Sequence, residues 1–440
     1  MNVLLEEFVL PRDLEMILNN SPSIIIPKTE EMLYDLIFGN GSTKQIDVSY
    51  DVNGTLVKEA DVVRCKNGAV VNYVEDYMRR RDPDCMRIGD DKPTDKPRFK
   101  DVYGYDFNTL KVDTYKWLAR QELILVPFMA GGYEYGYQAL LVCPRNAAFF
   151  AFALSQLQAF VCAKDIHNFK PRAIVYVAPP FRHTHFDGKQ VCVHNRLDDR
   201  HEVFAYNLYP GPSAKKGIYS VLLDIGEQEG WVTAHASAAK IVTPYENEMV
   251  MMHEGASGGG KSELLQDVHR VPDGRVLLGT NLESGDRDYL HMSDTCTIYP
   301  VTDDMAICHP SFQTGSGKLA LYDGEDGWFL RVDGITEYGS DPMYERITIH
   351  SKKPLVFFNI EGVPGSTCLV WEHTMDSTGK PCPNPRVIVP RRMVDNIVDK
   401  PVEVDVRSFG VRMPPSSAAH PDYGIMGLMH IIPPALAWLW

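Results

Sequence analysis

The residues best suited to chemistry form one glycine-rich segment, Gly255-Ala256-Ser257-Gly258-Gly259-Gly260-Lys261-Ser262. It fits the pattern G-x-x-x-x-G-K-[ST], whose glycines let successive backbone N–H groups point at phosphate oxygens. Lys261 is expected to reach the β- and γ-phosphates of a nucleoside triphosphate, and the Ser262 hydroxyl to ligate Mg²⁺. The apolar run 249–252 predicts a strand before the loop. A helix predicted at about 262–268 would direct the positive N-terminal end of its dipole at the phosphates. The alternative interpretation is a flexible glycine-rich surface loop.

A loop of this kind needs a nearby carboxylate to hold the metal ion of the bound nucleotide. The segment 297–304 provides one, because an apolar run is followed by Asp303 and Asp304. The end of a strand is where a Mg²⁺-binding carboxylate is expected in such an enzyme. Two adjacent aspartates alone are more typical of a solvated turn, and the preceding loop favours the metal-binding interpretation.

Three further positions carry side chains that bind anions or metals. His235 lies twenty residues before Gly255, although a single histidine is most often a core or surface residue. Lys215-Lys216 follows a Pro/Gly loop, and Arg79-Arg80-Arg81 is a basic triplet. Both would ordinarily be solvated. In an acidic chain they also suit an anionic substrate, because such cations pair with carboxylate and phosphate.

Composition limits the class of protein. A chain of 440 residues, 44% hydrophobic and 23% charged, is long enough for two globular domains. The formal net charge of −14 argues against a general nucleic-acid-binding protein. The sequence has nine cysteines, an odd number, and no C-x-x-C motif. This pattern indicates reduced thiols and a cytoplasmic location. The acidic residues near the start argue against a secretory signal, and the oligomeric state stays open.

The apolar patterning predicts a mixed α/β (α+β) fold in two domains. Residues 1–232 are expected to form a substrate-side domain, and residues 233–440 a strand-rich domain that contains the glycine-rich loop and binds the nucleotide. The segment 216–225 is either a helix or a strand. Predicted helices lie at 29–38 (with Thr29 as N-cap), 113–121 and 146–164. Predicted strands lie at 123–127, 173–177, 249–252, 275–278, 297–301, 306–308, 318–322, 345–350, 354–360 and 386–389.

The segment 423–440 is almost entirely apolar. Its length would just allow a membrane span. His430 and Pro433-Pro434 favour a buried helix or strand pair instead, so no membrane association is expected. Because a domain rarely ends in an apolar run, we expect the second domain to be incomplete on its C-terminal side.

Taken in order, these segments resemble the phosphoenolpyruvate carboxykinases, especially the ATP-dependent class. The glycine-rich loop fits that family's pattern G-x-S-G-x-G-K-[ST], including Ser257 and Gly258. Other segments similar to family motifs follow in the same order, at 80–88, 215–220 (KKGIYS), 235–238 (HASA), 302–304 (TDD), 384–390 (NPRVIVP), 395–398 (DNIV) and 408–415 (SFGVRMPP). The shared order covers most of the chain and is more specific than any single motif except the loop.

The resemblance implies a metal-binding role for five positions. Lys216, His235 and Asp304 would bind Mn²⁺, and the lysine would need a depressed pKa to do so. Ser262 and Asp303 would serve the Mg²⁺ of ATP or GTP.

The resemblance also implies a phosphoryl-transfer reaction on a small anionic carboxylate. Lys261 and Arg386 would neutralise charge on the transferring group, and Lys215 belongs to the same catalytic set. Arg81 would grip the carboxylate of oxaloacetate or phosphoenolpyruvate, and Tyr209 would line the same pocket.

Three departures from the family pattern keep other functions open. More than forty residues separate the loop from Asp303, although the two follow closely in the family. Asn359-Ile360-Glu361-Gly362 matches only the start of a family segment, whose lysine has no counterpart, and the chain ends within twenty-five residues of Pro415. One alternative is a kinase similar to HPr kinase, whose loop pattern fits as far as Glu263. The other is a nucleotide-binding regulator without turnover.

Overall fold

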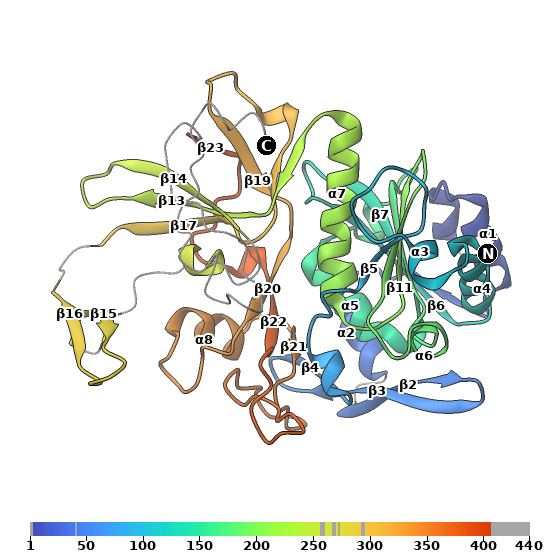
Figure 1. Cartoon of the computed structure of the whole chain (residues 1–440), viewed down its shortest axis with the longest axis horizontal. Coiled ribbons are helices and arrows are strands. Elements are labelled where there is room, and N and C mark those ends of the chain that lie inside the picture. The colour runs from blue at the N-terminus through green and yellow to red at the C-terminus, as the bar shows by residue number, and fades with distance from the viewer. Residues whose placement is uncertain are drawn as a thin grey trace. The chain divides into compact units, whose positions relative to one another are not determined.

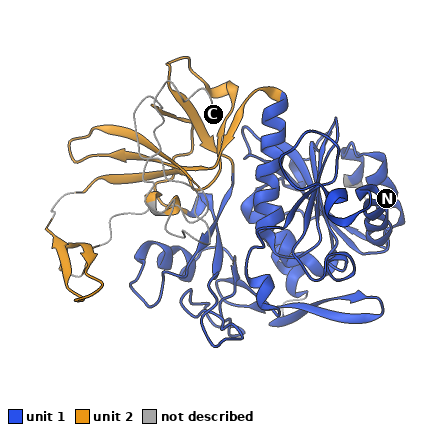
Figure 2. Cartoon of the chain, viewed as in Figure 1, with its two compact units in different colours: residues 1–228, 325–393 blue, residues 229–324, 394–440 orange. Residues whose placement is uncertain are grey.

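The computed structural model describes the chain at residues 3–39, 42–255, 260–265, 270–271, 273–291 and 295–405. This part of the chain forms two compact units (Figure 2). Unit 1 contains the residues up to Gln228 and the later segment Glu325–Met393, and unit 2 contains Glu229–Gly324 and the described residues from Val394 on. The boundary expected between residues 232 and 233 differs from this division. The reason is that three strands of the later segment complete a sheet of unit 1.

The larger sheet of unit 1 has eight strands and is mixed (Figure 1). Its strands are β1 (Ile24–Ile25), β5 (Met86–Ile88), β6 (Leu123–Ala130), β7 (Tyr137–Pro144), β8 (Ala159–Phe160), β9 (Ala173–Val177), β10 (Cys192–Arg196) and β11 (His201–Ala205). They are ordered β1-β6-β7-β9-β11-β10-β5, with β8 paired to β6. The pairs β6–β7, β6–β8 and β10–β11 are antiparallel, and the others are parallel. β9 is buried along its whole length, which explains its continuous apolar sequence.

Helices cover both faces of this sheet. The helices of unit 1 are α1 (Arg12–Asn20), α2 (Glu30–Phe38), α3 (Phe99–Tyr103), α4 (Phe107–Leu118), α5 (Ala148–Leu157), α6 (Phe181–His185) and α7 (Lys216–Glu229), together with α8 (Pro342–Ile349), which lies against the second sheet of this unit. Figure 1 shows α1 and α4 on one side of the sheet and α7 on the other. Leu14 of α1 and Leu110 of α4 share a buried core with Phe204 of β11. The preceding residue of that strand, Val203, faces Gly217 of α7 instead.

A second sheet of unit 1 has six strands and joins the two chain segments of this unit. Its strands, in sheet order, are β2 (Gln45–Val52), β3 (Thr55–Arg64), β4 (Gly68–Tyr73), β21 (Leu355–Phe358), β22 (Arg386–Pro390) and β20 (Gly327–Arg331). Only β4 and β21 pair in parallel. Asn359 directly follows β21, and Arg386 begins β22. This sheet therefore places two residues of the sequence prediction on neighbouring strands.

Unit 2 consists mainly of antiparallel strands. They are β12 (Val232–Ala234), β13 (Ala236–Val242), β14 (Glu248–Glu254), β15 (Val276–Thr280), β16 (Arg287–Leu290), β17 (Thr297–Thr302), β18 (Ala306–Cys308), β19 (Leu319–Asp323) and β23 (Val402–Val404). One sheet has the order β14-β13-β17 and another the order β12-β18-β19-β23. Ala236, Val301 and Leu321 belong to one buried core in this unit. The hairpin β15–β16 lies in the long segment between the glycine-rich loop and Asp303.

Several predictions from the sequence are confirmed. The fold is mixed α/β, and strands dominate after residue 233. The Oγ1 atom of Thr29 accepts the N–H of Met32 at 3.3 Å and caps α2. The strands predicted at 173–177 and 306–308 coincide with β9 and β18. The segment 216–225, for which either a helix or a strand was predicted, lies in the helix α7.

Three element predictions need correction. The strand predicted at 345–350 is wrong, because these residues lie almost entirely in α8. Asp341 caps this helix by accepting the N–H of Tyr344 at 3.0 Å, and Pro342 suits its first position. The helix predicted at 146–164 ends at Leu157, where the chain becomes extended and forms β8. The helix predicted at 113–121 begins earlier, after the N-cap Asp106.

Two predicted features lie outside the described residues. These are the apolar segment 423–440 and the segment 408–415 that resembles a family motif. Within the described ranges, none of the helices has both the length and the apolar character needed to cross a bilayer.

Candidate functional site

The centre of unit 2 brings three strand ends together beside the glycine-rich loop. β14 leads into Gly255, β13 starts after His235, and β17 ends before Asp303. Ala236 pairs with Glu254, and the N–H of Gly255 donates to the carbonyl oxygen of His235 at 3.2 Å. The antiparallel register of β13 and β14 therefore places the histidine next to the start of the loop.

Asp304 lies at the centre of this group. Its Oδ1 atom is 2.8 Å from Nε2 of His235 and 3.4 Å from Nζ of Lys261. Lys261 Nζ also donates to the carbonyl oxygen of Gly255 at 2.9 Å, and its side chain is 6% exposed. Asp304 and His235 stay partly accessible, at 12% and 26% of their side-chain surface. A buried ammonium, an imidazole and a carboxylate thus converge at one accessible point. We call His235, Lys261 and Asp304 the Asp304 cluster.

The turn that carries Asp303 and Asp304 is fixed by buried polar contacts. The single O–H of Thr302 is shared between the carbonyl oxygen of Met305 and Oδ1 of Asp323, each 3.0 Å from Oγ1. Asp303 is 2% exposed. The carboxylates therefore stand on a rigid strand end, as the sequence analysis expects.

The glycine-rich loop is only partly described. Gly260 has a φ of +81°, a left-handed conformation that favours glycine. Ser262 begins a short 3-10 helix, Ser262–Leu265, so the described residues show a single tight turn in place of the first part of the helix predicted at 262–268. Ala256, Ser257, Gly258 and Gly259 lie outside the described residues.

A second group of predicted residues converges in unit 1 around the amide of Asn384. Its Nδ2 atom donates to the hydroxyl of Tyr209 and to the carbonyl oxygen of Arg79, both at 2.9 Å. Its Oδ1 atom accepts from Nε of Arg386 at 2.7 Å. The Arg386 guanidinium also donates to the carbonyl oxygen of Phe329 and lies 5.3 Å from the centre of that ring. We call Arg79, Tyr209, Asn384 and Arg386 the Asn384 cluster.

Asn359 supports the Asn384 cluster from the end of β21. It is fully buried, has a φ of +60°, and donates from Nδ2 to the carbonyl oxygen of Asn384 at 3.1 Å. Positive φ in a buried non-glycine residue is uncommon and is often found near functional sites. Asn359 therefore holds the backbone of Asn384, two residues before Arg386.

Lys215 and Lys216 stand where an irregular turn becomes a helix. Gly211–Lys215 is a π-helical turn, a form often found at functional sites, and it continues into α7. Lys215 Nζ lies 3.5 Å from Oε2 of Glu325, and both side chains are buried. Lys216 Nζ lies 5.3 Å from the ring centre of Tyr219.

A chain of hydrogen bonds lies beneath the first turns of α7. His194 Nδ1 is 2.9 Å from Nε2 of His201, and His201 Nδ1 is 2.9 Å from Oδ2 of Asp224, a residue of α7. Burial, together with the neighbouring His201 and Arg196, lowers the pKa of His194 to about 3. The chain ties the sheet to the helix that carries Lys216.

Arg81 has a different setting from the two arginines before it. Arg79 and Arg80 both pair with the buried carboxylate of Asp376. Arg81 is exposed. Burial raises the pKa of the Cys85 thiol, and the positive charge of Arg81 opposes this rise. Arg80 is exposed as well, at 56% of its side-chain surface, so its pairing with Asp376, and not burial, distinguishes it from Arg81.

Sequence reasoning missed Asn384 and Glu59. Glu59 is almost fully buried, accepts the N–H of Leu208 at 3.1 Å and also accepts the hydroxyl of Tyr50. Burial raises its pKa. The Tyr73 hydroxyl donates to the carbonyl oxygen of Leu208 at 2.8 Å, so the backbone before Tyr209 is held on both sides. No local pattern marks Glu59, since its partners lie far away in the sequence.

The predicted metal ligands fall into two groups. His235 and Asp304 are in contact in unit 2, with Asp303 and Ser262 in the same unit, whereas Lys216 belongs to unit 1. Over the part of the chain that the structure describes, no three His, Cys, Asp or Glu side chains are grouped as metal ligands. All nine cysteines are free, and seven are buried.

Comparison with known families covers almost the whole chain. A family model described as "Domain of unknown function (DUF4914)" matches residues 10–440. A search of the curated proteins found no match. Since the match extends over far more than half of the sequence, the chain belongs to the DUF4914 family.

Proposed function

We propose that this protein is a metal-dependent phosphoryl-transfer enzyme that acts between ATP or GTP and a small carboxylate. The observation that carries the proposal is the contact of Asp304 with both His235 and Lys261. These three residues come from separate parts of the sequence, and each was assigned to nucleotide or metal binding by its motif. The most specific form of the proposal is the conversion of oxaloacetate and ATP into phosphoenolpyruvate, ADP and CO₂.

The Asp304 cluster would bind the triphosphate end of the nucleotide. Lys261 now donates to Gly255 and faces Asp304. A triphosphate would draw its ammonium toward the phosphate oxygens, where a buried cation neutralises charge effectively. The backbone N–H groups of the glycine-rich loop and the Ser262 hydroxyl would complete the phosphate contacts.

The donor set of this cluster fits a divalent cation such as Mn²⁺ or Mg²⁺. Asp304 supplies a carboxylate oxygen and His235 an imidazole nitrogen, with Asp303 next in the chain. A cation would take over the charge compensation that Lys261 now gives Asp304. When bound, it would polarise the phosphoryl oxygens and offset their negative charge. Lys216 lies in unit 1, so the metal proposal rests on His235 and Asp304.

The Asn384 cluster would bind the carboxylate partner. Tyr209 supplies a hydroxyl, and Arg386 a guanidinium whose Nε is held by Asn384. Arg81 is exposed on the loop that follows Arg79. Fixed positioning of reactants supplies much of the rate of phosphoryl transfer, so the rigid contacts of this cluster suit the role. Lys215 would add positive charge from the π-helical turn.

The proposal extends to the location of the protein. Nine free thiols, seven of them buried, suit a reducing compartment. We place the protein in the cytoplasm, where ATP and oxaloacetate are both substrates of ordinary metabolism.

The direct test is turnover of oxaloacetate with ATP or GTP and Mn²⁺, followed by the appearance of phosphoenolpyruvate. Lys261→Ala should abolish turnover. Lys240→Ala is the matched control, because Lys240 belongs to the same unit and forms a more exposed ion pair with Glu248. Transfer of the phosphoryl group only to another acceptor, such as the serine hydroxyl of a partner protein, with ADP as the other product, would instead favour an HPr-kinase-like activity. Nucleotide binding without any product would favour a regulator.

A further inference from the structure

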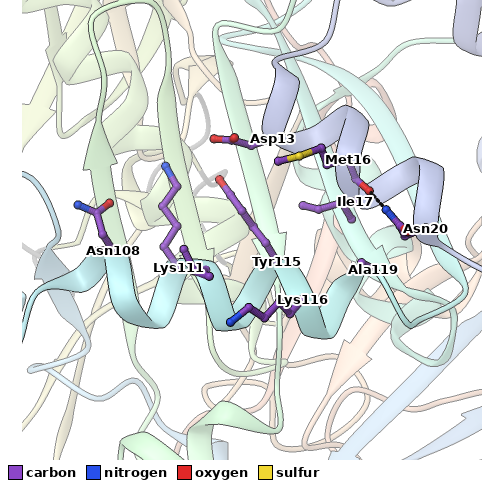
Figure 3. Close-up of a pocket in the computed structure, with 10 residues that line it drawn as sticks. Asp13, Met16, Ile17, Asn20, Asn108, Lys111, Tyr115, Lys116 and Ala119 are labelled. Atoms are coloured by element: carbon purple, nitrogen blue, oxygen red, sulfur yellow. Dashed lines mark hydrogen bonds between the residues drawn. The ribbon is translucent and has the colours of Figure 1, made fainter.

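Two helices of unit 1 enclose a cavity that plays no part in the proposed reaction. It lies between α1 and α4 and has a volume of about 420 Å³ (Figure 3). Ligand pockets in proteins commonly measure about 300–1,000 Å³. Asp13, Met16 and Ile17 lie on one face of α1, and Lys111 and Tyr115 lie on one face of α4. The helical spacing of these residues directs them into the same groove.

A buried ammonium group stands at one end of the cavity. Lys111 is 8% exposed, and its Nζ atom lies 2.5 Å from Oε2 of the fully buried Glu202. Glu202 also accepts from Asn195 at 2.7 Å, from Tyr115 at 3.1 Å and from Arg200 at 3.3 Å. Its two oxygens are therefore saturated with donors. An ammonium has three N–H donors. Glu202 is the one hydrogen-bond partner of Lys111 within the described residues, so Lys111 has donors left for a ligand.

A carboxylate faces the same end of the cavity. Asp13 makes no hydrogen bond or ion pair in the described structure, although it lines the cavity beside Tyr115. Figure 3 shows the polar ends of Asp13, Lys111 and Tyr115 gathered together. Burial raises the pKa of Tyr115, and the carboxylates of Glu202 and Asp13 contribute to the rise. The Tyr115 hydroxyl therefore stays neutral and can accept a hydrogen bond while it donates to Glu202.

The walls of the cavity are apolar. Met16 and Val112 line the cavity and are 56% and 48% exposed, so both present apolar surface to it. Ile17 and Ala119 continue this surface away from the polar end. A ligand that covers Met16 and Val112 would remove apolar surface from water and gain free energy by doing so.

We propose that this cavity binds a free α-amino acid with an apolar side chain. The carboxylate of the ligand would accept from Lys111, and its ammonium would donate to Asp13 and to the Tyr115 hydroxyl. The side chain would lie against Met16 and Val112. An acid without an amine would leave Asp13 unmatched, and an amine without a carboxylate would leave Lys111 unmatched. A polyanion such as a nucleotide would be repelled by Asp13.

The test is calorimetric titration of the full chain with three probes: L-leucine, 4-methylpentanoate, which lacks the amine, and L-leucinamide, which lacks the carboxylate. L-leucine should bind saturably, and the other two should bind at least about tenfold more weakly, since one ionic contact is lost in each. Asp13→Asn should weaken leucine binding by a similar factor. Lys116→Gln is the control, because Lys116 lines the cavity but pairs with Asp113 and is 65% exposed.

Asp13 is the residue to change because Lys111 supports a buried carboxylate. Removing Lys111 would leave Glu202 short of a partner and would risk unfolding. Absence of saturable leucine binding at millimolar concentration would overturn the proposal. Equal leucine affinity in the wild type and in Asp13→Asn would overturn it as well. Neither result depends on the phosphoryl-transfer activity, because none of the residues tested belongs to the Asp304 or Asn384 cluster.

Discussion

The Nε2 atom of His235 lies 2.8 Å from the Oδ1 atom of Asp304, although the two residues are 69 positions apart in the sequence. The contact arises because β13 pairs with both β14 and β17, so that the end of one strand meets the start of another. Lys261 reaches the same carboxylate oxygen from the glycine-rich loop. An imidazole and an ammonium thus meet on one carboxylate at this point of unit 2, and such groups suit the proposed binding of phosphate and of a divalent cation.

The metal role proposed for this contact leads to the first prediction. Asp304→Asn and His235→Ala should each weaken Mn²⁺ binding by about tenfold or more, because each change removes one of two neighbouring donors. Titration calorimetry with Mn²⁺ measures the effect. Asp273→Asn is the control, since Asp273 is an exposed residue of unit 2 that pairs with Arg275. Mn²⁺ affinity that stays unchanged in both variants would remove the metal site from this cluster.

The Asn384 cluster leads to the second prediction. Asn384→Leu removes the acceptor of Arg386 and the donor to Tyr209 while keeping the number and branching of the side-chain heavy atoms. Turnover should fall and KM for the carboxylate should rise, whereas nucleotide affinity should stay the same. The stability cost should be about 1–3 kcal/mol, because buried partners are left unpaired.

Steady-state kinetics and urea unfolding separate the effect on substrate binding from the effect on stability. Asn146→Ala, at an exposed position of unit 1, serves as control. Loss of stability with unchanged KM would show that Asn384 is structural only.

Arg81 leads to the third prediction. Its exposed side chain is accessible to a ligand, whereas Arg79 and Arg80 are paired with Asp376. Arg81→Ala should weaken binding of the carboxylate substrate about tenfold or more and leave ATP affinity unchanged. Competition binding with oxaloacetate and separate ATP titrations measure the two affinities. Arg120→Ala, another exposed arginine of unit 1, should have no effect on either. A loss of ATP affinity alone would assign the loop to the nucleotide.

His194 leads to the fourth prediction, which concerns pH. The pKa of this buried histidine is about 3 in the folded protein, and about 6.5 is usual in an unfolded chain. Between these values the unfolded state binds more protons. The stability that His194 supports is therefore complete above pH 6.5 and is lost as the pH falls toward 3. The slope is up to about 1.4 kcal/mol per pH unit.

His194→Gln tests this pH dependence, because glutamine can still hydrogen-bond to His201 but does not titrate. Urea unfolding at several pH values from 7 to 4 measures the slope. The variant should lose less stability than the wild type over this range. Identical slopes in both proteins would show that another group causes the acid sensitivity.

The extent to which the sequence predicts this structure differs from element to element. The helix 30–38 was predictable because Thr29 caps it and its apolar positions repeat with helical spacing. The strand predicted at 345–350 failed because its residues suit a strand, while the signals for a helix, Asp341 and Pro342, lie just before them. Local capping outweighed intrinsic propensity there.

The site shows the same limits. Lys261, His235 and Asp304 stood out through motifs, and their contact in the structure agrees with a shared role. Asn384 did not stand out, because its amide joins residues 79, 209 and 386, which only the tertiary fold brings together. The role of Glu59 could not be predicted either, because its contact with Leu208 also depends on the tertiary fold. The Lys111–Glu202 pair also spans distant positions, and a single lysine on a helix carries no signal that it is buried.

Binding of Mg²⁺–ATP to the wild type and to Lys261→Ala, by titration calorimetry on the full chain, tests the central claim most directly. The account predicts saturable binding to the wild type and to the Lys240→Ala control, and binding at least about a hundredfold weaker to Lys261→Ala, because the buried ammonium meets the β- and γ-phosphates. Equal affinity in Lys261→Ala and the wild type, or no binding of ATP or GTP to the wild type, would contradict it.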